Sequence, residues 1–279
     1  MDQGRGAEWL SNLSGANALM GGLAGRFDGH AHIFRSDLPM ASPRRYTPDY
    51  HAEPKTYCQH MKEHDLDGAI LVQPSFLGTD NSYMLDQMVQ MDGKDGLTFR
   101  AVVVLDPQDK SLDRAALEDF SARGVIGLRL NVVGKKDAEV ADLSDWEKLV
   151  RLADQLGWHV ELHCEGPRLA KPLSQLLSWS QQVVVDHFGL PGGTDPLTCG
   201  GMAAMTYAPA EQLFVKCSAP YRVFPDLSVA QAAEQIKPVF THLAEHLGPE
   251  HLLWGSDWPH TRFEAKQCFA DSVSWMAGM

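Results

Sequence analysis

The chain has 279 residues, of which 44% are hydrophobic, and its 24 Lys+Arg against 36 Asp+Glu give a formal net charge of -12. This length allows one large α/β barrel or two ordinary domains, with ample apolar residues for a packed core. The acidic balance argues against nucleic-acid and anionic-membrane partners, because both bind basic surfaces. A small anionic ligand would therefore have to be bound by local arginines.

The cysteines, the apolar runs and the first residues indicate where the protein is located and where its domain begins. Five cysteines lie far apart without a Cys-x-x-Cys pair, which predicts a reduced, cytoplasmic protein. No apolar run approaches the roughly 18 residues of a membrane span. Residues 1–25 are Gly-rich and lack the basic start of a signal peptide. We expect an N-terminal extension over residues 1–25 and one domain over residues 26–279.

From residue 26 onward, short β-rich runs alternate with helix-like segments, the pattern of repeated βα units. We predict eight strands, near 26–34, 68–75, 99–107, 125–133, 158–165, 182–189, 213–220 and 252–258. Helices are expected between them, near 54–65, 80–91, 112–123, 145–156, 168–180, 201–211, 228–247 and 262–276.

Runs such as Val183–Val185 are apolar on both faces, as expected of parallel strands covered by helices. Eight βα units within the roughly 250 residues typical of the fold predict an α/β protein of the (β/α)8 TIM barrel class. A doubly wound sheet shares the alternation, but it usually has a Gly-rich phosphate-binding turn, and the sequence has none.

Polar residues gather near the carboxyl ends of the predicted strands, where barrel enzymes hold their active sites. His30 and His32 lie late in the first strand, and alternation places both imidazoles on one face. By the same rule, Asp186 should point away from the lumen if its neighbour His187 points into it. The remaining candidates end later strands: Gln73, Ser75, Arg129, Asn131, His163, His187 and Asp257.

Three segments carry a family resemblance: FDGHAH at 27–32, VVDHFG at 184–189 and LWGSDWPH at 253–260. They resemble the amidohydrolase superfamily, and within it the branch of pyrone-dicarboxylate, sugar-lactone and sulfomuconolactone hydrolases. The resemblance implies a (β/α)8 barrel and a hydrolase of carboxylic ester bonds in lactones, with a role in the catabolism of aromatic compounds.

The resemblance also implies roles for four residues. Asp257 would activate water, and His187, His30 and His32 would polarise the lactone carbonyl. The same four residues could hold one divalent ion, zinc or manganese. Members of the branch also work without metal, so metal-independent catalysis is the alternative.

The fourth strand bears on the metal and on the substrate. It carries Arg129 and Asn131 where two-metal relatives place a bridging Lys or Glu, so we expect no binuclear centre. Arg129 and Arg222 resemble carboxylate-binding arginines of the branch. Further candidate substrate contacts are Tyr46, Ser75, Asn131 and His163.

The leading prediction is a hydrolase that opens a small anionic lactone after Asp257 deprotonates water. Glu161 and Glu165 are competing bases on the fifth strand. The alternatives are a metal-dependent decarboxylase of the same superfamily and a catalytically silent barrel that binds a small acid. A homo-oligomer is a further expectation.

Overall fold

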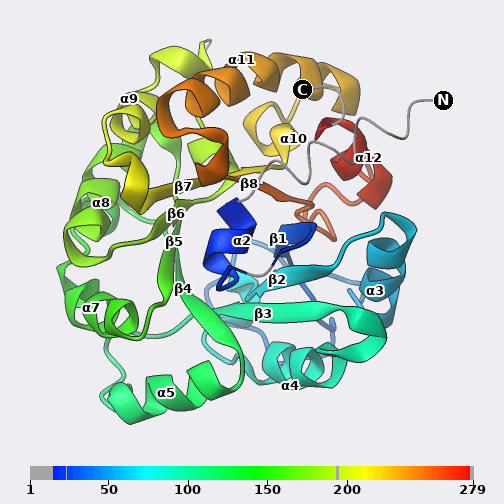
Figure 1. Cartoon of the computed structure of the whole chain (residues 1–279). Helices are drawn as coiled ribbons and strands as arrows, with labels where there is room; N and C mark the ends of the chain where they lie inside the picture. Colours follow the sequence, from blue (N-terminus) through cyan, green and yellow to red (C-terminus); the bar gives the residue numbers. More distant parts are fainter. Residues whose placement is uncertain (1–14, 23, 193–194, 277–279) are drawn as a thin grey trace.

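Eight parallel strands pair in the order in which they occur along the chain (Figure 1), which confirms the predicted (β/α)8 barrel. The computed structural model describes residues 15–22, 24–192 and 195–276. The strands are β1 (Phe27–Ala31), β2 (Gly68–Val72), β3 (Thr98–Val103), β4 (Val125–Asn131), β5 (His159–His163), β6 (Val183–Val185), β7 (Leu213–Ser218) and β8 (Leu252–Gly255).

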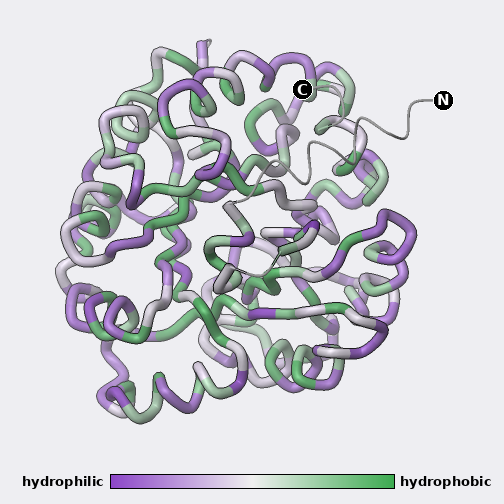
Figure 2. Tube along the Cα trace, in the orientation of Figure 1, coloured by the Kyte–Doolittle hydropathy of each residue, from purple (hydrophilic) through white to green (hydrophobic). Residues whose placement is uncertain are grey.

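Helices surround the barrel (Figure 1), and hydrophobic residues are concentrated in the central strands while the outer helix surfaces are more hydrophilic (Figure 2). They are α2 (Gly15–Leu19), α3 (Pro54–Glu63), α4 (Ser82–Met91), α5 (Arg114–Ala122), α6 (Asp137–Ala141), α7 (Glu147–Gln155), α8 (Gly166–Trp179), α9 (Gly200–Thr206), α10 (Pro220–Val223), α11 (Val229–Leu247) and α12 (Phe269–Ser274).

Backbone hydrogen bonds join the end of β1 to the segment that follows β8. The amide of Asp257 donates to the carbonyl of His30 at 2.8 Å, and the amide of His32 donates to the carbonyl of Trp258 at 2.8 Å. These bonds place the first and last polar segments side by side at the carboxyl end of the barrel.

A buried carboxylate strengthens this junction. Asp28 accepts hydrogen bonds from the backbone amide of Ser256 at 2.8 Å, from its hydroxyl at 2.5 Å, and from the Tyr57 hydroxyl on α3 at 2.7 Å. Burial nevertheless raises the pKa of Asp28. Asp28 therefore links β1, α3 and the segment after β8.

The amino end of the barrel is covered by α2 (Figure 1). Ala16, Leu19 and Met20 are buried against apolar side chains of the barrel interior, among them Phe27 and Leu253. The second half of the segment predicted as an extension thus packs on the barrel, whereas residues 1–14 lie outside the described residues.

The strands end earlier than the sequence predicts. For example, β6 ends at Val185 and not near 189, and β8 ends at Gly255 and not near 258. Beyond these points the backbone leaves the ladder, and His187 and Asp257 adopt left-handed conformations with φ of 52° and 57°. His187 and Asp257 therefore lie on turns that follow the strands, whereas His30, Arg129 and His163 lie within strands.

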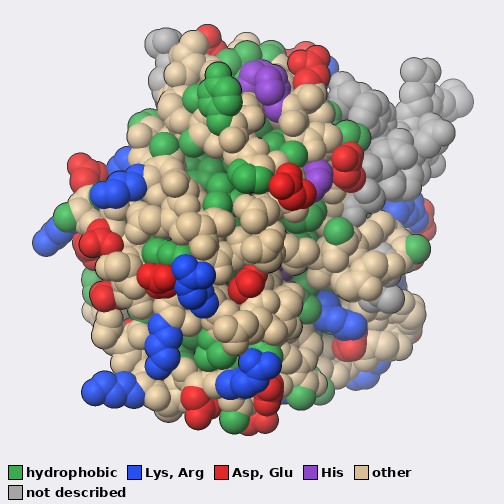
Figure 3. Space-filling view, turned by 60° about the vertical axis from the view of Figure 1, so that its left-hand side comes forward, with side chains coloured by type: hydrophobic (Ala, Val, Ile, Leu, Met, Phe, Trp, Pro, Cys, Tyr) green, Lys and Arg blue, Asp and Glu red, His purple; other side chains and the backbone are tan. Residues whose placement is uncertain are grey.

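Within the described residues, none of the helices combines the length and apolar character that a membrane crossing requires. The face in Figure 3 shows acidic and basic side chains interspersed. All five cysteines are free thiols.

Candidate active site

Asp257 is fully buried, and one of its oxygens is firmly held. Its Oδ2 accepts from the Tyr221 hydroxyl at 2.5 Å and from Arg222 Nε at 2.7 Å, both from α10. Burial opposes the charge, but Arg222 together with His187 and His32 outweighs it, so the pKa of Asp257 lies below its usual value. Asp257 is therefore a carboxylate at neutral pH. Sequence reasoning did not single out Tyr221.

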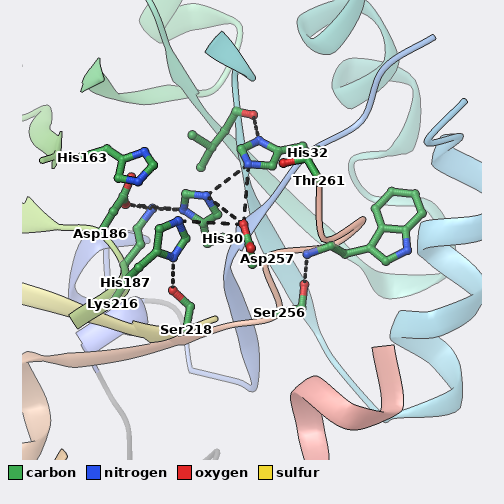
Figure 4. Close-up of polar contacts among 12 residues, drawn as sticks. His30, His32, His163, Asp186, His187, Lys216, Ser218, Ser256, Asp257 and Thr261 are labelled. Atoms are coloured by element: carbon green, nitrogen blue, oxygen red, sulfur yellow. Dashed lines mark hydrogen bonds and ion pairs between the residues drawn. The ribbon is translucent and has the colours of Figure 1, made fainter. Parts of the chain in front are cut away.

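The other oxygen of Asp257 faces three imidazoles (Figure 4). Oδ1 is buried and has no hydrogen-bond partner among the described residues. It lies 3.8 Å from Nε2 of His30, 3.9 Å from Nε2 of His32 and 3.9 Å from Nε2 of His187. The first and last of the predicted catalytic segments are thus brought together around one unpartnered oxygen.

Hydrogen bonds assign the tautomers of the paired histidines. The carbonyl of Val72 lies 2.7 Å from His32 Nδ1, which must therefore carry its proton there. Lys216 Nζ lies 2.8 Å from His30 Nδ1 and donates to it, which leaves the His30 proton on Nε2. This proton is donated to His32 Nε2 at 3.2 Å. Burial first, and then Lys216, lowers the pKa of His30 well below its usual value.

Lys216 belongs to a fully buried group of charges inside the barrel. Its ammonium lies 2.5 Å from Glu161 Oε1 and 3.5 Å from Asp186 Oδ1. Arg129 donates to Asp186 Oδ2 through Nε at 3.0 Å and Nη2 at 2.8 Å. Burial would raise the pKa of Asp186, but Arg129 and Lys216 hold it below its usual value.

The prediction that Asp186 points away from the lumen is wrong. Val184 faces the barrel interior, and alternation carries Asp186 to the same side. The strand has ended at Val185, and the left-handed turn at His187 then brings that residue inward as well. The alternation rule fails here because His187 does not belong to the strand.

In His187 and His163, a contact at Nδ1 orients the imidazole ring. His187 Nδ1 lies 2.8 Å from Ser218 Oγ on β7, and His163 Nδ1 accepts from Arg129 Nη2 at 3.1 Å. Burial is the main cause that lowers the pKa of His187 and of His32 to about 4, and it lowers that of His163 well below its usual value. The imidazoles are therefore neutral at pH 7.

Comparison with known proteins identifies the family. The Amidohydrolase family model matches residues 27–274, nearly the whole chain. The chain belongs to the amidohydrolase family. A curated relative is the 2-pyrone-4,6-dicarboxylate hydrolase of Comamonas testosteroni, 28% identical over 266 residues, with 91% of this chain and 82% of the relative covered.

Two solved structures are similar to this amidohydrolase along most of their length. A putative 2-pyrone-4,6-dicarboxylic acid hydrolase from Pseudomonas putida is 33% identical, with a TM-score of 0.80 and coverage of 91% of this chain and 90% of that one. A probable 2-pyrone-4,6-dicarboxylic acid hydrolase from Acinetobacter baumannii, solved with citric acid bound, is 29% identical, with a TM-score of 0.81 and coverage of 90% and 91%.

The amidohydrolase has a cavity of about 280 Å³ over this cluster. The predicted catalytic and substrate-binding residues line it except for His30, which lies buried next to His32 and Asp257. The candidate Gln73 is also absent from the wall, and its amide donates to the carbonyls of Gly78 and Asp80. The predicted residues at the cavity wall are His32, Tyr46, Ser75, Arg129, Asn131, His163, His187, Arg222 and Asp257.

The predicted substrate contacts differ in whether their side chains already form hydrogen bonds within the protein. The Tyr46 hydroxyl donates to Glu264 Oε1 at 2.7 Å. Asn131 Oδ1 accepts from Arg45 Nη2 at 3.3 Å. Ser75 follows β2 at the start of a short 3₁₀ turn and is exposed at the wall. Of these side chains, only that of Ser75 has no hydrogen bond to another described residue.

Sequence reasoning missed three charged residues of the amidohydrolase site. Lys216 could have been found, because it lies between Phe214 and Ser218 in an alternating strand, where a charged side chain must face the lumen. Arg45 and Arg262 lie on irregular segments, and no periodicity in the sequence indicates that they meet at one cavity.

The donor set of this amidohydrolase offers a possible metal site. The ligand atoms of His30, His32 and Asp257 lie within 4.8 Å of one another. The unpartnered Oδ1 of Asp257 and the Nδ1 bond of His32 suit one divalent ion, since ligating imidazoles usually donate their second N–H to a carbonyl or carboxylate. Among the described residues of β4, Arg129 and Asn131 supply no bridging ligand for a second ion.

Proposed function

We propose that this amidohydrolase opens a carboxylated ring lactone, a pyrone dicarboxylate or a sugar-acid or muconolactone relative, by attack of water on the lactone carbonyl. The observation that carries the proposal is the buried, unpartnered Oδ1 of Asp257, directed at the neutral histidines. The similarity to pyrone-dicarboxylate hydrolases supports the choice of reaction.

In the proposed reaction, Asp257 Oδ1 accepts a proton as the water oxygen bonds to the carbonyl carbon. His32 Nε2 lies 3.9 Å from Oδ1 but already accepts the proton of His30 Nε2, so Asp257 is the acceptor for the water. When the ring carbon–oxygen bond breaks, Asp257 returns the proton to the departing oxygen. The products are a new carboxylic acid and a hydroxyl or enol on the same molecule.

Negative charge develops on the carbonyl oxygen during the attack and needs donors. His187 Nε2 can donate when the Ser218 hydroxyl donates to its Nδ1, whereas His30 donates its Nε2 proton to His32 and holds that ring in place. Arg129 lines the same cavity and supplies a fixed positive charge. A neutral imidazole thus acts as a donor through its one N–H and does not have to become an imidazolium cation.

One divalent ion, zinc or manganese, would be held by His30, His32, His187 and Asp257 together. Such an ion would supply a Lewis acid. The contact between Lys216 and His30 supports the metal-independent alternative, because it keeps the His30 proton on Nε2, the atom that would bind the ion. Elemental analysis of protein purified without chelator should find at most one ion per chain.

The rest of the assignment is also a proposal. Arg129 and Arg222 would contact the carboxylate of the lactone, because each reaches the cavity wall. The five free cysteines support a cytoplasmic location. The homo-oligomer expected from the sequence stays a prediction.

A pH-indicator screen of the purified protein against a panel of lactones tests the function. We expect release of one proton per ring opened for a carboxylated lactone, with no CO2. Release of CO2 from a carboxylated aromatic acid would support the decarboxylase instead. Ligand binding without any product would support the silent barrel.

A further inference from the structure

The cavity has an excess of positive charge in a chain whose net charge is -12. Four guanidinium groups line it, and Asp257 is the one carboxylate among the described lining residues. Arg129 and Arg222 are each paired with a buried aspartate, as described above. The remaining two, Arg45 and Arg262, make no ion pair with any described residue and lie at the exposed mouth.

Arg45 is held in place although it is exposed. Its Cδ lies against Gly134 in the loop after β4, where an added Cβ would be 3.0 Å away. Its Nη2 donates to Asn131 Oδ1 at 3.3 Å, the one hydrogen bond of this guanidinium to the described residues. Partial burial, followed by the charges of Arg262 and Arg129, lowers the pKa of Arg45. Like charges thus meet there, and Glu165 opposes their effect on the pKa of Arg45 only in part and without an ion pair.

Arg262 belongs to a segment with an unusual backbone. Asp257, His260 and Arg262 have φ of 57°, 64° and 73°. Such conformations persist in non-glycine residues when surrounding contacts impose them, and they gather at functional sites. Here Arg222 Nη2 donates to the carbonyl and to Oγ1 of Thr261, both at 3.2 Å. The side chain of Arg262 makes no hydrogen bond to the described residues.

The carboxylates near the mouth already have partners. Glu165 accepts from Arg168 and from the Gly134 amide, and Glu264 accepts from Tyr46. The described residues therefore form no ion pair with Arg45 or Arg262, and an anion in the cavity can take that place.

We propose that Arg45 and Arg262 bind a second carboxylate of the substrate, remote from the lactone carbonyl. The inference rests on the proposed function and narrows it to ring lactones with two carboxylates. Guanidinium groups suit this task, because their planar donors match the two oxygens of a carboxylate. Arg129 and Arg222 would then be left for the group nearer the reacting carbonyl.

Citrate binding tests the pair without turnover. Isothermal titration of the full chain with citrate at low ionic strength should show that R45M and R262M each weaken binding about five- to tenfold, and that the double variant weakens it further. Arg44→Met is the matched control, because Arg44 is on the same loop but donates to Thr47 and to the Ala41 carbonyl. Its affinity should stay within about twofold of the parent.

The melting temperature without citrate separates binding from folding. We expect the melting temperature of the double variant to equal or exceed that of the parent, because the change removes repulsion between like charges. Unchanged citrate affinity in the double variant would overturn the proposal, as would an equal loss in Arg44→Met or no binding of citrate by the parent.

A kinetic comparison tells failure of the subsite from failure of the function. With 2-pyrone-4,6-dicarboxylate, the double variant should lose at least about tenfold in kcat/KM, and with a monocarboxylated pyrone it should lose less. Equal losses on both substrates would overturn the subsite. If the parent opens no lactone while citrate binding still depends on the pair, the proposed function fails and the anion subsite stands.

Discussion

At the scale of single residues, the two oxygens of Asp257 have different tasks. Oδ2 is fixed by Tyr221 and Arg222, so Oδ1 keeps one orientation toward the histidines. A carboxylate with a lowered pKa is a weak base, and it stays deprotonated far into the acid range. Catalysis at the proposed site therefore depends on the position of Oδ1 and on the exclusion of bulk water more than on the basicity of Asp257.

Replacing Asp257 by Asn should lower kcat by about 10²–10⁴-fold with the fold intact, because general base catalysis typically contributes that much. Asn accepts the left-handed backbone at this position. Glu165→Gln is the control, since Glu165 lies on the rim and bonds to Arg168. An inactive Glu165→Gln beside a nearly active Asp257→Asn would move the base to the segment between β5 and α8.

Replacing Arg222 by Met should move the acid limb of the pH–rate profile to higher pH. Arg222 favours the charged form of Asp257, so its removal raises the pKa of Asp257, and the base is then protonated at a higher pH. At pH 7 we expect kcat/KM to fall at least about tenfold. Arg222→Lys keeps the charge and should move the limb less; an identical limb in all three proteins would contradict the assignment.

At the scale of elements, glycines let the first and last strands approach closely. A Cβ on Gly255 in β8 would lie 2.7 Å from the Cβ of His30. Gly255→Ala should displace β1 and His30, with a loss of about 1–3 kcal/mol in the free energy of unfolding and a lower kcat. Denaturant unfolding and activity measure both effects. Gly200→Ala at the start of α9, with nothing within 4 Å, should change neither; equal effects of the two changes would refute the explanation.

Element by element, the sequence predicts the barrel better than it predicts the site. Apolar runs and turn signals locate all eight strands, since buried parallel strands have a strong pattern. The turns after the strands follow no such periodicity, so the inward direction of Asp186 was predicted wrongly. The segment 262–276 shows the same limit, because it forms α12 only at Phe269–Ser274. Arg45 and Arg262 meet only through tertiary structure.

At the scale of the whole molecule, buried neutral histidines make stability depend on pH. The folded pKa of His32, His187 and His260 is about 4, below the ordinary value of 6.5. Between these values the unfolded chain binds more protons, so the free energy of unfolding falls as pH drops from 6.5 toward 4, and their full contribution is present above 6.5. Asp186 and Asp257 have lowered values and contribute to pH dependence only below about pH 4.

We therefore expect the melting temperature to decrease steadily from pH 7 to pH 4.5, by roughly 2–4 °C for each kcal/mol lost. Differential scanning calorimetry in buffers of matched ionic strength measures this slope. His187→Asn removes one of the titrating groups and should show a shallower slope. A flat profile for the parent protein would mean that these histidines bind protons in the folded state as they do in the unfolded chain.

The junction of β1 with the segment after β8 also governs when the site can exist. His30 and His32 are synthesised well before Asp257, and the bonds of Asp28 to Ser256 span 228 positions. Contacts so distant in sequence are slow to form, because a long loop must close first. A nascent or truncated chain without β8 lacks the base, the binding partner of Arg222 and the closed barrel together. Catalytic activity thus reports that β8 and the segment after it have been made and have joined β1.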